Sequence, residues 1–165
     1  MENTRTSTPV ASRHTGEADE QAQARRRFCD LLYWLRTNVG AGEEALLGVS
    51  LYAISMIWNL GAWYVGTQVV RILKYGARAD YASKYGRGAT GMYDLSCEVR
   101  GRFGLGWVDA IAIARIVRDE ETGCKTDDLT AWETRMKAEN ECVVALMERD
   151  GIDPAHIDEV RQLLL

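Results

Sequence analysis

The sequence is poor in proline and histidine, and it has little that indicates β-structure. Its only prolines, Pro9 and Pro154, lie near the two ends, so the middle of the chain carries no helix breaker. We find no alternating apolar and polar run bounded by hairpin dipeptides such as Asn-Gly. The sequence therefore predicts an all-α fold, and its 165 residues suffice for one domain with its own core.

Motifs of enzyme and metal chemistry are also missing. His14 and His156 are far apart, and the four cysteines form no Cys-x-x-Cys pair. Neither a P-loop nor a Gly-x-Ser-x-Gly elbow occurs, and the glycines at 86–91 follow no predicted strand, as a dinucleotide site requires. We predict no enzyme, no catalytic residues, no cofactor and no metal site. The cysteines are interpreted as buried free thiols, with an intermolecular disulfide as the alternative.

Basic residues do not predominate. The formal net charge is −4, so the chain as a whole is not typical of a polyanion-binding protein. The one dense basic run, Arg25–Arg27, is diluted by Glu17, Asp19 and Glu20.

One long uncharged stretch dominates the sequence. Ala45–Val70 carries no formal charge, and apolar side chains occur at nearly every helical phase. A helix that is apolar all round is buried on several sides or lies in a membrane. Continued to Leu73, it would run about 45 Å as one helix, too long to be hidden by the rest of this chain. We predict that a second copy covers it.

The remaining pattern divides the chain into three parts. Residues 1–17 are predicted to be a disordered arm. Residues 18–118 form a helical assembly domain, with a hairpin at about 43–100 and a short apolar base helix at 105–118. Residues 119–165 form a helical C-terminal extension.

The extension carries two helix-start signals. A helix is expected at about Asp128–Arg149, where Thr130 and Glu133 are spaced as in a capping box. Asp153 and Pro154 suit the N-cap and first position of a final helix.

Three local features resemble a known family when taken in order. They are the run Leu60–Gly66 (LGAWYVG), the run Leu95–Arg102 (LSCEVRGR) and the apolar helix Trp107–Val117. Together they resemble the core (capsid) protein of hepadnavirus-like viruses, including their non-enveloped fish relatives, the nackednaviruses. The resemblance covers about residues 43–118.

The resemblance implies a structural role. In that family two helical hairpins pair into a four-helix bundle, and the homodimers self-assemble into an icosahedral shell around the viral genome. Localisation would be the virion, and the host cytoplasm during assembly. The implied dimer-interface residues are Tyr52, Trp58, Trp63, Tyr64 and Cys97. The implied residues of base packing and assembly are Phe28, Trp34, Trp107, Ile111 and Trp132.

The chain departs from that family in two places. The family follows its base helix with a proline-containing arm, whereas no proline lies between Pro9 and Pro154. The family also ends in an arginine-rich tail that binds nucleic acid by neutralising phosphates, whereas this sequence ends acidic and apolar. Viral nucleic acid is therefore expected as a partner only if a basic tail follows residue 165.

Two other readings compete with a capsid subunit. One is a self-contained helical bundle, which would bury the aromatic residues in its own core, fold residues 128–165 back over the hairpin, and could be a monomeric or dimeric protein-binding regulator of the Bcl-2 type. A small helical membrane protein is the other, because Ala45–Val70 is long enough to span a bilayer. Asn59, Gln68 and the central position of the aromatic residues argue against a lipid-facing helix.

Overall fold

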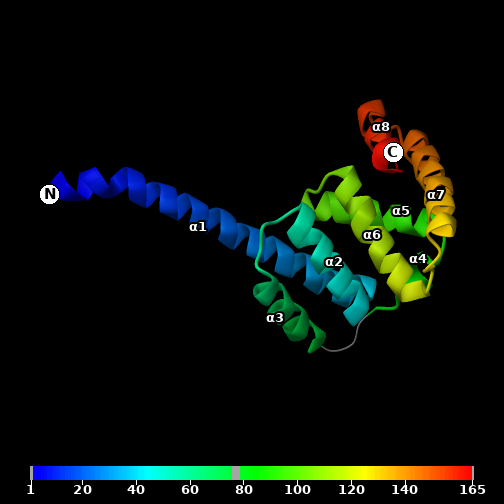
Figure 1. The fold of residues 1–165 in the computed structure, drawn as a ribbon, viewed down its shortest axis with the longest axis horizontal. Coiled ribbons are helices and arrows are strands. Elements are labelled where there is room, and N and C mark those ends of the chain that lie inside the picture. Colours follow the sequence, from blue (N-terminus) through cyan, green and yellow to red (C-terminus); the bar gives the residue numbers. More distant parts are fainter. Residues whose placement is uncertain (1, 76–78, 165) are drawn as a thin grey trace.

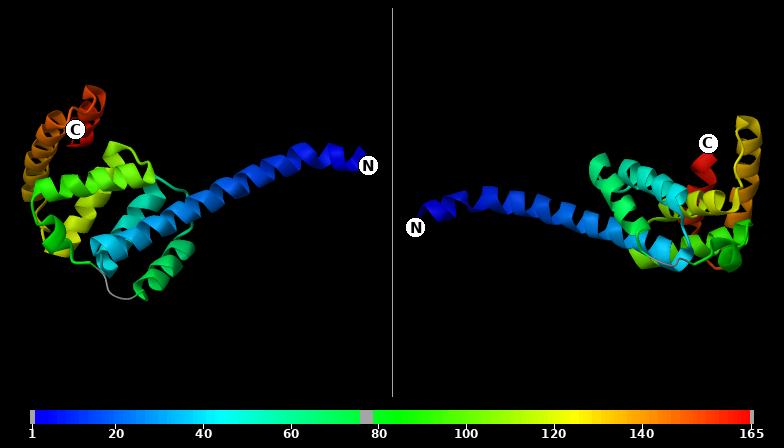
Figure 2. Two further views of the ribbon diagram at one scale, coloured as in Figure 1. Left: turned by 180° about the vertical axis from the view of Figure 1, so that it is seen from behind. Right: turned by 90° about the horizontal axis from the view of Figure 1, so that it is seen from below.

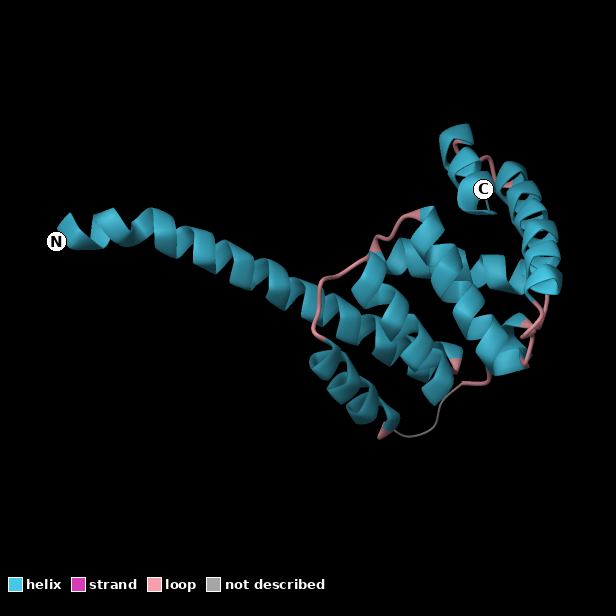
Figure 3. Cartoon of the chain, in the orientation of Figure 1, coloured by secondary structure: helices cyan, strands magenta, loops and turns pink. Residues whose placement is uncertain are grey.

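The computed structural model of the chain describes residues 2–75 and 79–164, with side chains described for residue 16 and for residues 18–75 and 79–163. Every regular element among these residues is helical (Figure 3), which confirms the all-α prediction. The elements are α1 (Glu2–Trp34), η1 (Leu35–Val39), α2 (Glu43–Met56), α3 (Ala62–Leu73), α4 (Tyr81–Tyr85), α5 (Ala89–Phe103), α6 (Trp107–Thr122), α7 (Leu129–Arg149), α8 (Pro154–Arg161) and η2 (Gln162–Leu164).

The helices form a body from which α1 projects (Figure 1). The C-terminal part of α1 lies beside α2 and α3, α6 packs against α2 and α5, and α7 and α8 cover the opposite end (Figure 2). Residues 2–17, predicted as a disordered arm, continue the backbone of α1. The side chains of 2–15 and 17 lie outside the described residues, as does Met1, and disorder there stays a prediction.

The prediction of one continuous helix over Ala45–Val70 is wrong. The stretch forms two helices, α2 and α3, joined by non-helical residues 57–61. At the break the Trp58 amide donates to the Ala53 carbonyl at 2.7 Å, and Gly61 is extended. The Trp58 ring then packs edge-on against Phe28 of α1, with centroids 6.4 Å apart. Because the stretch is divided into two helices, α1 covers α3 and α6 covers α2. One chain thereby buries much of an apolar surface that would stay exposed on a single straight helix.

The second half of the predicted hairpin forms two helices, α4 and α5. They are separated at Gly86–Gly88, and Gly86 has a positive φ of 77°. Gly91 allows the first turn of α5 to approach the backbone of Tyr85 so closely that any Cβ there would overlap its carbonyl. Residues 76–78, within the predicted hairpin at about 43–100, lie outside the described residues.

The core centres on α6, the predicted base helix. Its residues Ile111, Ile113, Ala114 and Val117 are fully buried. Gly48 of α2 faces Ile116, and a Cβ there would meet that side chain at 2.8 Å. Close approach of α2 to α6 therefore depends on the small residue at 48.

The C-terminal extension forms the two predicted helices. Asp128 caps α7 by accepting from the amides of Thr130 and Ala131, so this aspartate, and not the capping box expected at Thr130, begins the helix. Asp153 caps α8 ahead of Pro154, as predicted. The extension packs against α5 and α6, as the reading of a self-contained bundle expects.

Candidate functional site

The outer face of α3 carries an open, largely apolar groove. It is lined by Ala62, Trp63, Gly66, Thr67, Val70, Arg71 and Lys74 and has a volume of about 700 Å³. Trp63 is 82% exposed and Val70 is 59% exposed, whereas Val65, Val69 and Ile72 on the inner side are buried. Exposure of a tryptophan to this degree on an apolar helix face is typical of an interaction surface.

The residues predicted to form a dimer interface do not share one surface. Trp58 is buried within the chain, and the Tyr52 hydroxyl donates to Asp109 of α6 at 2.7 Å. The Tyr64 hydroxyl lies 3.1 Å from the Cys29 sulfur of α1. Cys97 is half-buried on α5, where burial raises the pKa of its thiol. Trp63 alone among the five is fully open to a partner.

The residues predicted for base packing lie mostly in the core. Phe28 and Ile111 are fully buried, and Trp34 and Trp107 are nearly so. Trp34 packs edge-on against Phe103 at 5.7 Å between ring centroids. Trp132 is the exception, because it lies 37% exposed on α7. All four cysteines are free thiols, but none is fully buried: Cys142 is exposed and the other three are half-buried, so the predicted burial is wrong.

A second pocket lies between α1 and the end of α5, and the sequence did not predict it. This arginine–aromatic pocket encloses about 460 Å³ and is lined by Arg27, Asp30, Tyr33, Trp34, Asn38, Arg102 and Phe103. The Arg102 guanidinium lies over the Trp34 ring at 5.1 Å. Arg27 lies over the Trp58 ring at 5.6 Å and donates to the Phe103 carbonyl at the end of α5.

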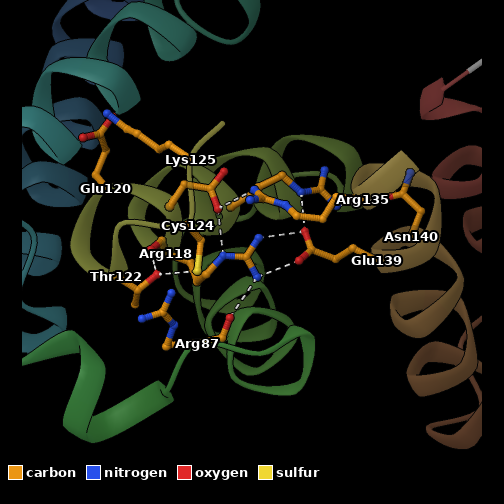
Figure 4. A network of polar contacts seen from close by, with 11 residues as sticks. Arg87, Arg118, Glu120, Thr122, Cys124, Lys125, Arg135, Glu139 and Asn140 are labelled. Atoms are coloured by element: carbon orange, nitrogen blue, oxygen red, sulfur yellow. Dashed lines mark hydrogen bonds and ion pairs between the residues drawn. The ribbon is translucent and has the colours of Figure 1, made fainter. Parts of the chain in front are cut away.

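A third cluster joins α6 to α7 through buried charges (Figure 4). This α6–α7 ion network centres on Glu139, whose two carboxylate oxygens meet Arg115 Nε at 2.8 Å and Arg118 Nη1 at 2.6 Å. Arg118 also pairs with Asp119 at 2.8 Å, and Arg115 donates to the Asn140 side-chain oxygen at 2.7 Å. Arg118 is only 2% exposed, so its charge depends on these partners.

The network shifts its two carboxyl groups in opposite directions. Burial raises the pKa of Glu139, but hydrogen bonds from Arg118 and Arg115 outweigh it, so the net pKa is lowered. For Asp119, burial prevails over the guanidiniums of Arg118 and Arg135, and the pKa is raised. Glu139 is therefore the carboxylate that holds the two buried arginines.

Charge is distributed unevenly along the chain. Residues 119–165 hold 13 acidic and 5 basic side chains, a net charge of −8, against 11 acidic and 15 basic, a net charge of +4, in residues 1–118. The net charge of −4 therefore conceals a basic N-terminal part and an acidic C-terminal part.

Neither a metal centre nor a membrane-spanning segment is seen in the described ranges. Over residues 2–75 and 79–164, no group of three or more histidine, cysteine or acidic side chains is arranged to hold a metal. No helix in those ranges combines the length and the apolar character needed to cross a bilayer.

Comparisons with known proteins give no relative: no family model, no curated protein and no solved structure matches the chain. Candidate sites must therefore be argued from the geometry.

Sequence reasoning missed the arginine–aromatic pocket because Arg27 and Arg102 are 75 positions apart and only folding brings them together. The α6–α7 network carried a weak signal, since Arg115 and Arg118 lie three apart in an otherwise apolar run. Arginines on a buried helix face must pair with acidic groups.

Proposed function

We propose that this chain is a self-associating structural protein that forms homodimers and, from them, a shell of the capsid type. The observation that carries the proposal is the outer face of α3, with Trp63 82% exposed. The ordered likeness of residues 43–118 to viral core proteins supports the larger assembly. The sequence predicted that a second copy covers the whole of Ala45–Val70. We now propose that the second copy covers α3 alone.

A second copy of α3 suits this face. Ala62, Gly66 and Val70 recur at four-residue spacing, and a Cβ at Gly66 would meet no other atom within 4 Å. Antiparallel pairing about a two-fold axis centred near Gly66 puts Trp63 of each copy opposite Val70 of the other. The small central residue permits close approach, and the tryptophan covers the apolar end of its partner.

In the family that the sequence resembles, two helical hairpins form the dimer contact. In the pairing proposed here, α3 forms that contact. With α2 beside it in each copy, the dimer contact is a layer of four helices. Basic residues Arg71 and Lys74 at the end of α3 lie at the rim, beside the partner's tryptophan, where a cation can interact with the ring.

The test is the mass of the purified protein by size exclusion with light scattering, with negative-stain imaging of the largest fraction. We expect dimers and uniform shells for the unaltered chain. Trp63→Glu should convert them to monomer, because a central aromatic anchor contributes about 2 kcal/mol or more, over tenfold in affinity. Leu129→Glu, at an exposed apolar side chain of α7, is the control and should leave the mass unchanged.

A second variant separates association from folding. Gly66→Leu blocks close approach of two α3 helices while raising helix propensity by about 1 kcal/mol, so it should yield a monomer at least as stable as the parent chain. If the parent chain forms dimers without shells, the α3 contact is supported and the capsid assembly is contradicted. A monomeric parent chain would contradict both the dimer and the capsid and would favour the helical protein-binding regulator.

A further inference from the structure

Two guanidinium groups of the arginine–aromatic pocket are held by aromatic rings and not by carboxylates. Among the described residues, Arg27 and Arg102 form no ion pair: Arg27 donates to a backbone carbonyl, and both lie over tryptophan rings. In contrast Arg115, Arg118, Arg135, Arg149 and Arg161 all pair with carboxylates. Stacking holds the two pocket guanidiniums in place and leaves donor edges available to an anion.

We propose that this pocket binds single-stranded nucleic acid, with phosphates on Arg27 and Arg102 and a base against Tyr33. The inference does not rest on the proposed assembly. It replaces the expectation that nucleic acid requires a basic tail, because the globular domain itself supplies the basic groove.

Aromatic side chains make the pocket suited to bases as well as phosphates. Tyr33 is 46% exposed and is steadied by an edge-on contact with Tyr75 at 5.1 Å between centroids. Single-strand binding sites combine such stacking surfaces with a basic groove. A volume of about 460 Å³ lies within the usual range of small-molecule sites, which is room for a nucleotide unit.

Two further arginines lie on α1 next to the pocket. Arg26 is exposed, and Arg25 lies over the Tyr64 ring at 4.7 Å. Neither forms an ion pair with another described residue. Consecutive helix residues point in different directions, so these arginines add positive charge near the pocket without lining it.

Two polar residues of the pocket favour a nucleic acid over an acidic protein segment. Asp30 and Asn38 lie in the lining, where a carboxylate and an amide oxygen can accept from the exocyclic amino group of a base. The side chains of an acidic peptide offer no such donor. The net charge of +4 over residues 1–118 further favours a polyanion at this end.

The experiment is fluorescence anisotropy of a labelled mixed-sequence RNA single strand, titrated with the full chain at several salt concentrations. Trp63→Glu serves as the background, so that association between copies does not add avidity. Arg102→Gln should weaken binding about tenfold at low salt and reduce the salt slope by about 0.7, one phosphate contact on a single strand. Tyr33→Leu should weaken binding about tenfold with the slope unchanged, since stacking releases no counterions.

Arg149→Gln is the matched control, because it removes an exposed arginine that pairs with Asp150 at the far end of α7. It should bind as the background does. Circular dichroism and melting of each variant establish that the fold is kept.

Several results would overturn the assignment. They are absence of binding at low salt, equal weakening by Arg149→Gln and Arg102→Gln, or oligoglutamate binding as tightly with the same variant dependence. Complete competition by mononucleotide at low excess would identify a free nucleotide, and not a strand, as the ligand. The two proposals fail independently. The mass measurement reports association through α3, whereas this titration reports RNA binding at the pocket.

Discussion

The arginines at the two ends of the molecule occupy opposite environments. At the junction of α1 and α5, Arg27 and Arg102 lie over tryptophan rings without an acidic partner among the described residues. Between α6 and α7, Arg115 and Arg118 are buried and share Glu139. A buried guanidinium requires a carboxylate because it has lost its water, whereas one held on an aromatic face keeps water and stays available. The same residue type thus stabilises the fold at one end and offers a binding surface at the other.

The largest expected effect is at the centre of the buried network. Glu139→Gln leaves two buried guanidiniums facing a neutral amide, and we expect the free energy of unfolding to fall by about 3–5 kcal/mol. Urea denaturation followed by circular dichroism measures this. Glu141→Gln, at an exposed position on the same helix, should change stability by about 0.5 kcal/mol or less. Equal effects of the two variants would mean that the network does not hold α7 on α6.

Acidification should weaken the same end of the molecule. The folded pKa of Glu139 lies below its ordinary value of 4.5, so its contribution is complete above that pH and is lost as pH falls through the folded pKa. Asp119 acts in the opposite sense: its raised pKa gives a contribution present below its ordinary value and lost as pH rises through the folded pKa.

A pH series of urea denaturations on the parent chain, Glu139→Gln and Asp119→Asn separates the two carboxyl groups. The stability difference between the parent and Glu139→Gln should shrink below about pH 4.5. A difference that stays constant down to the acid limit would show that Glu139 is not ionised in the folded state.

A smaller effect is expected where Arg27 meets α5. Arg27→Gln removes its hydrogen bond to the Phe103 carbonyl and its contact with the Trp58 ring. Together these should contribute about 1–2 kcal/mol, seen as a lower melting temperature. Arg26→Gln, exposed beside it, is the control and should melt with the parent. If Arg27→Gln lowered stability as much as Glu139→Gln does, Arg27 would be a structural arginine like Arg115 and Arg118, and the contrast between the two ends of the molecule would be wrong.

The smallest expected effect on stability is at Arg102. Its described contact is the cation–π interaction with Trp34, so Arg102→Gln should cost about 0.5–1 kcal/mol, measured by urea denaturation. Arg102→Lys keeps the charge and should recover part of the RNA affinity, but not the planar stacking. Substitution of Arg102 should therefore change RNA binding more than stability, whereas Glu139→Gln should change stability.

The start of the last helix was predicted correctly. Asp153 and Pro154 act through the local backbone, and the structure begins α8 at Pro154 with Asp153 as its cap. The continuous helix over Ala45–Val70 was predicted wrongly because local pattern reports how apolar a stretch is and not where it bends. The break at 57–61 follows from what Trp58 gains by packing on Phe28.

The candidate site residues were also predicted only in part. Trp63 was predicted as a contact residue, and its high exposure leaves it available for that role, although the contact itself stays a prediction. Tyr52 and Trp58, expected at the same interface, contact α6 and α1 of their own chain. The arginine–aromatic pocket was not predicted, since the basic run at 25–27 looked diluted by its sequence neighbours.

Composition and spacing were enough to establish an all-helical chain and the start of its last helix, because caps and amphipathic faces depend on residues a few positions apart. Packing established which aromatic residues are covered and which arginines are paired. Arg102 meets Trp34, and Arg118 meets Glu139, across separations that no local rule spans. Burial and electrostatic pairing depend on distance in space, and folding sets that distance.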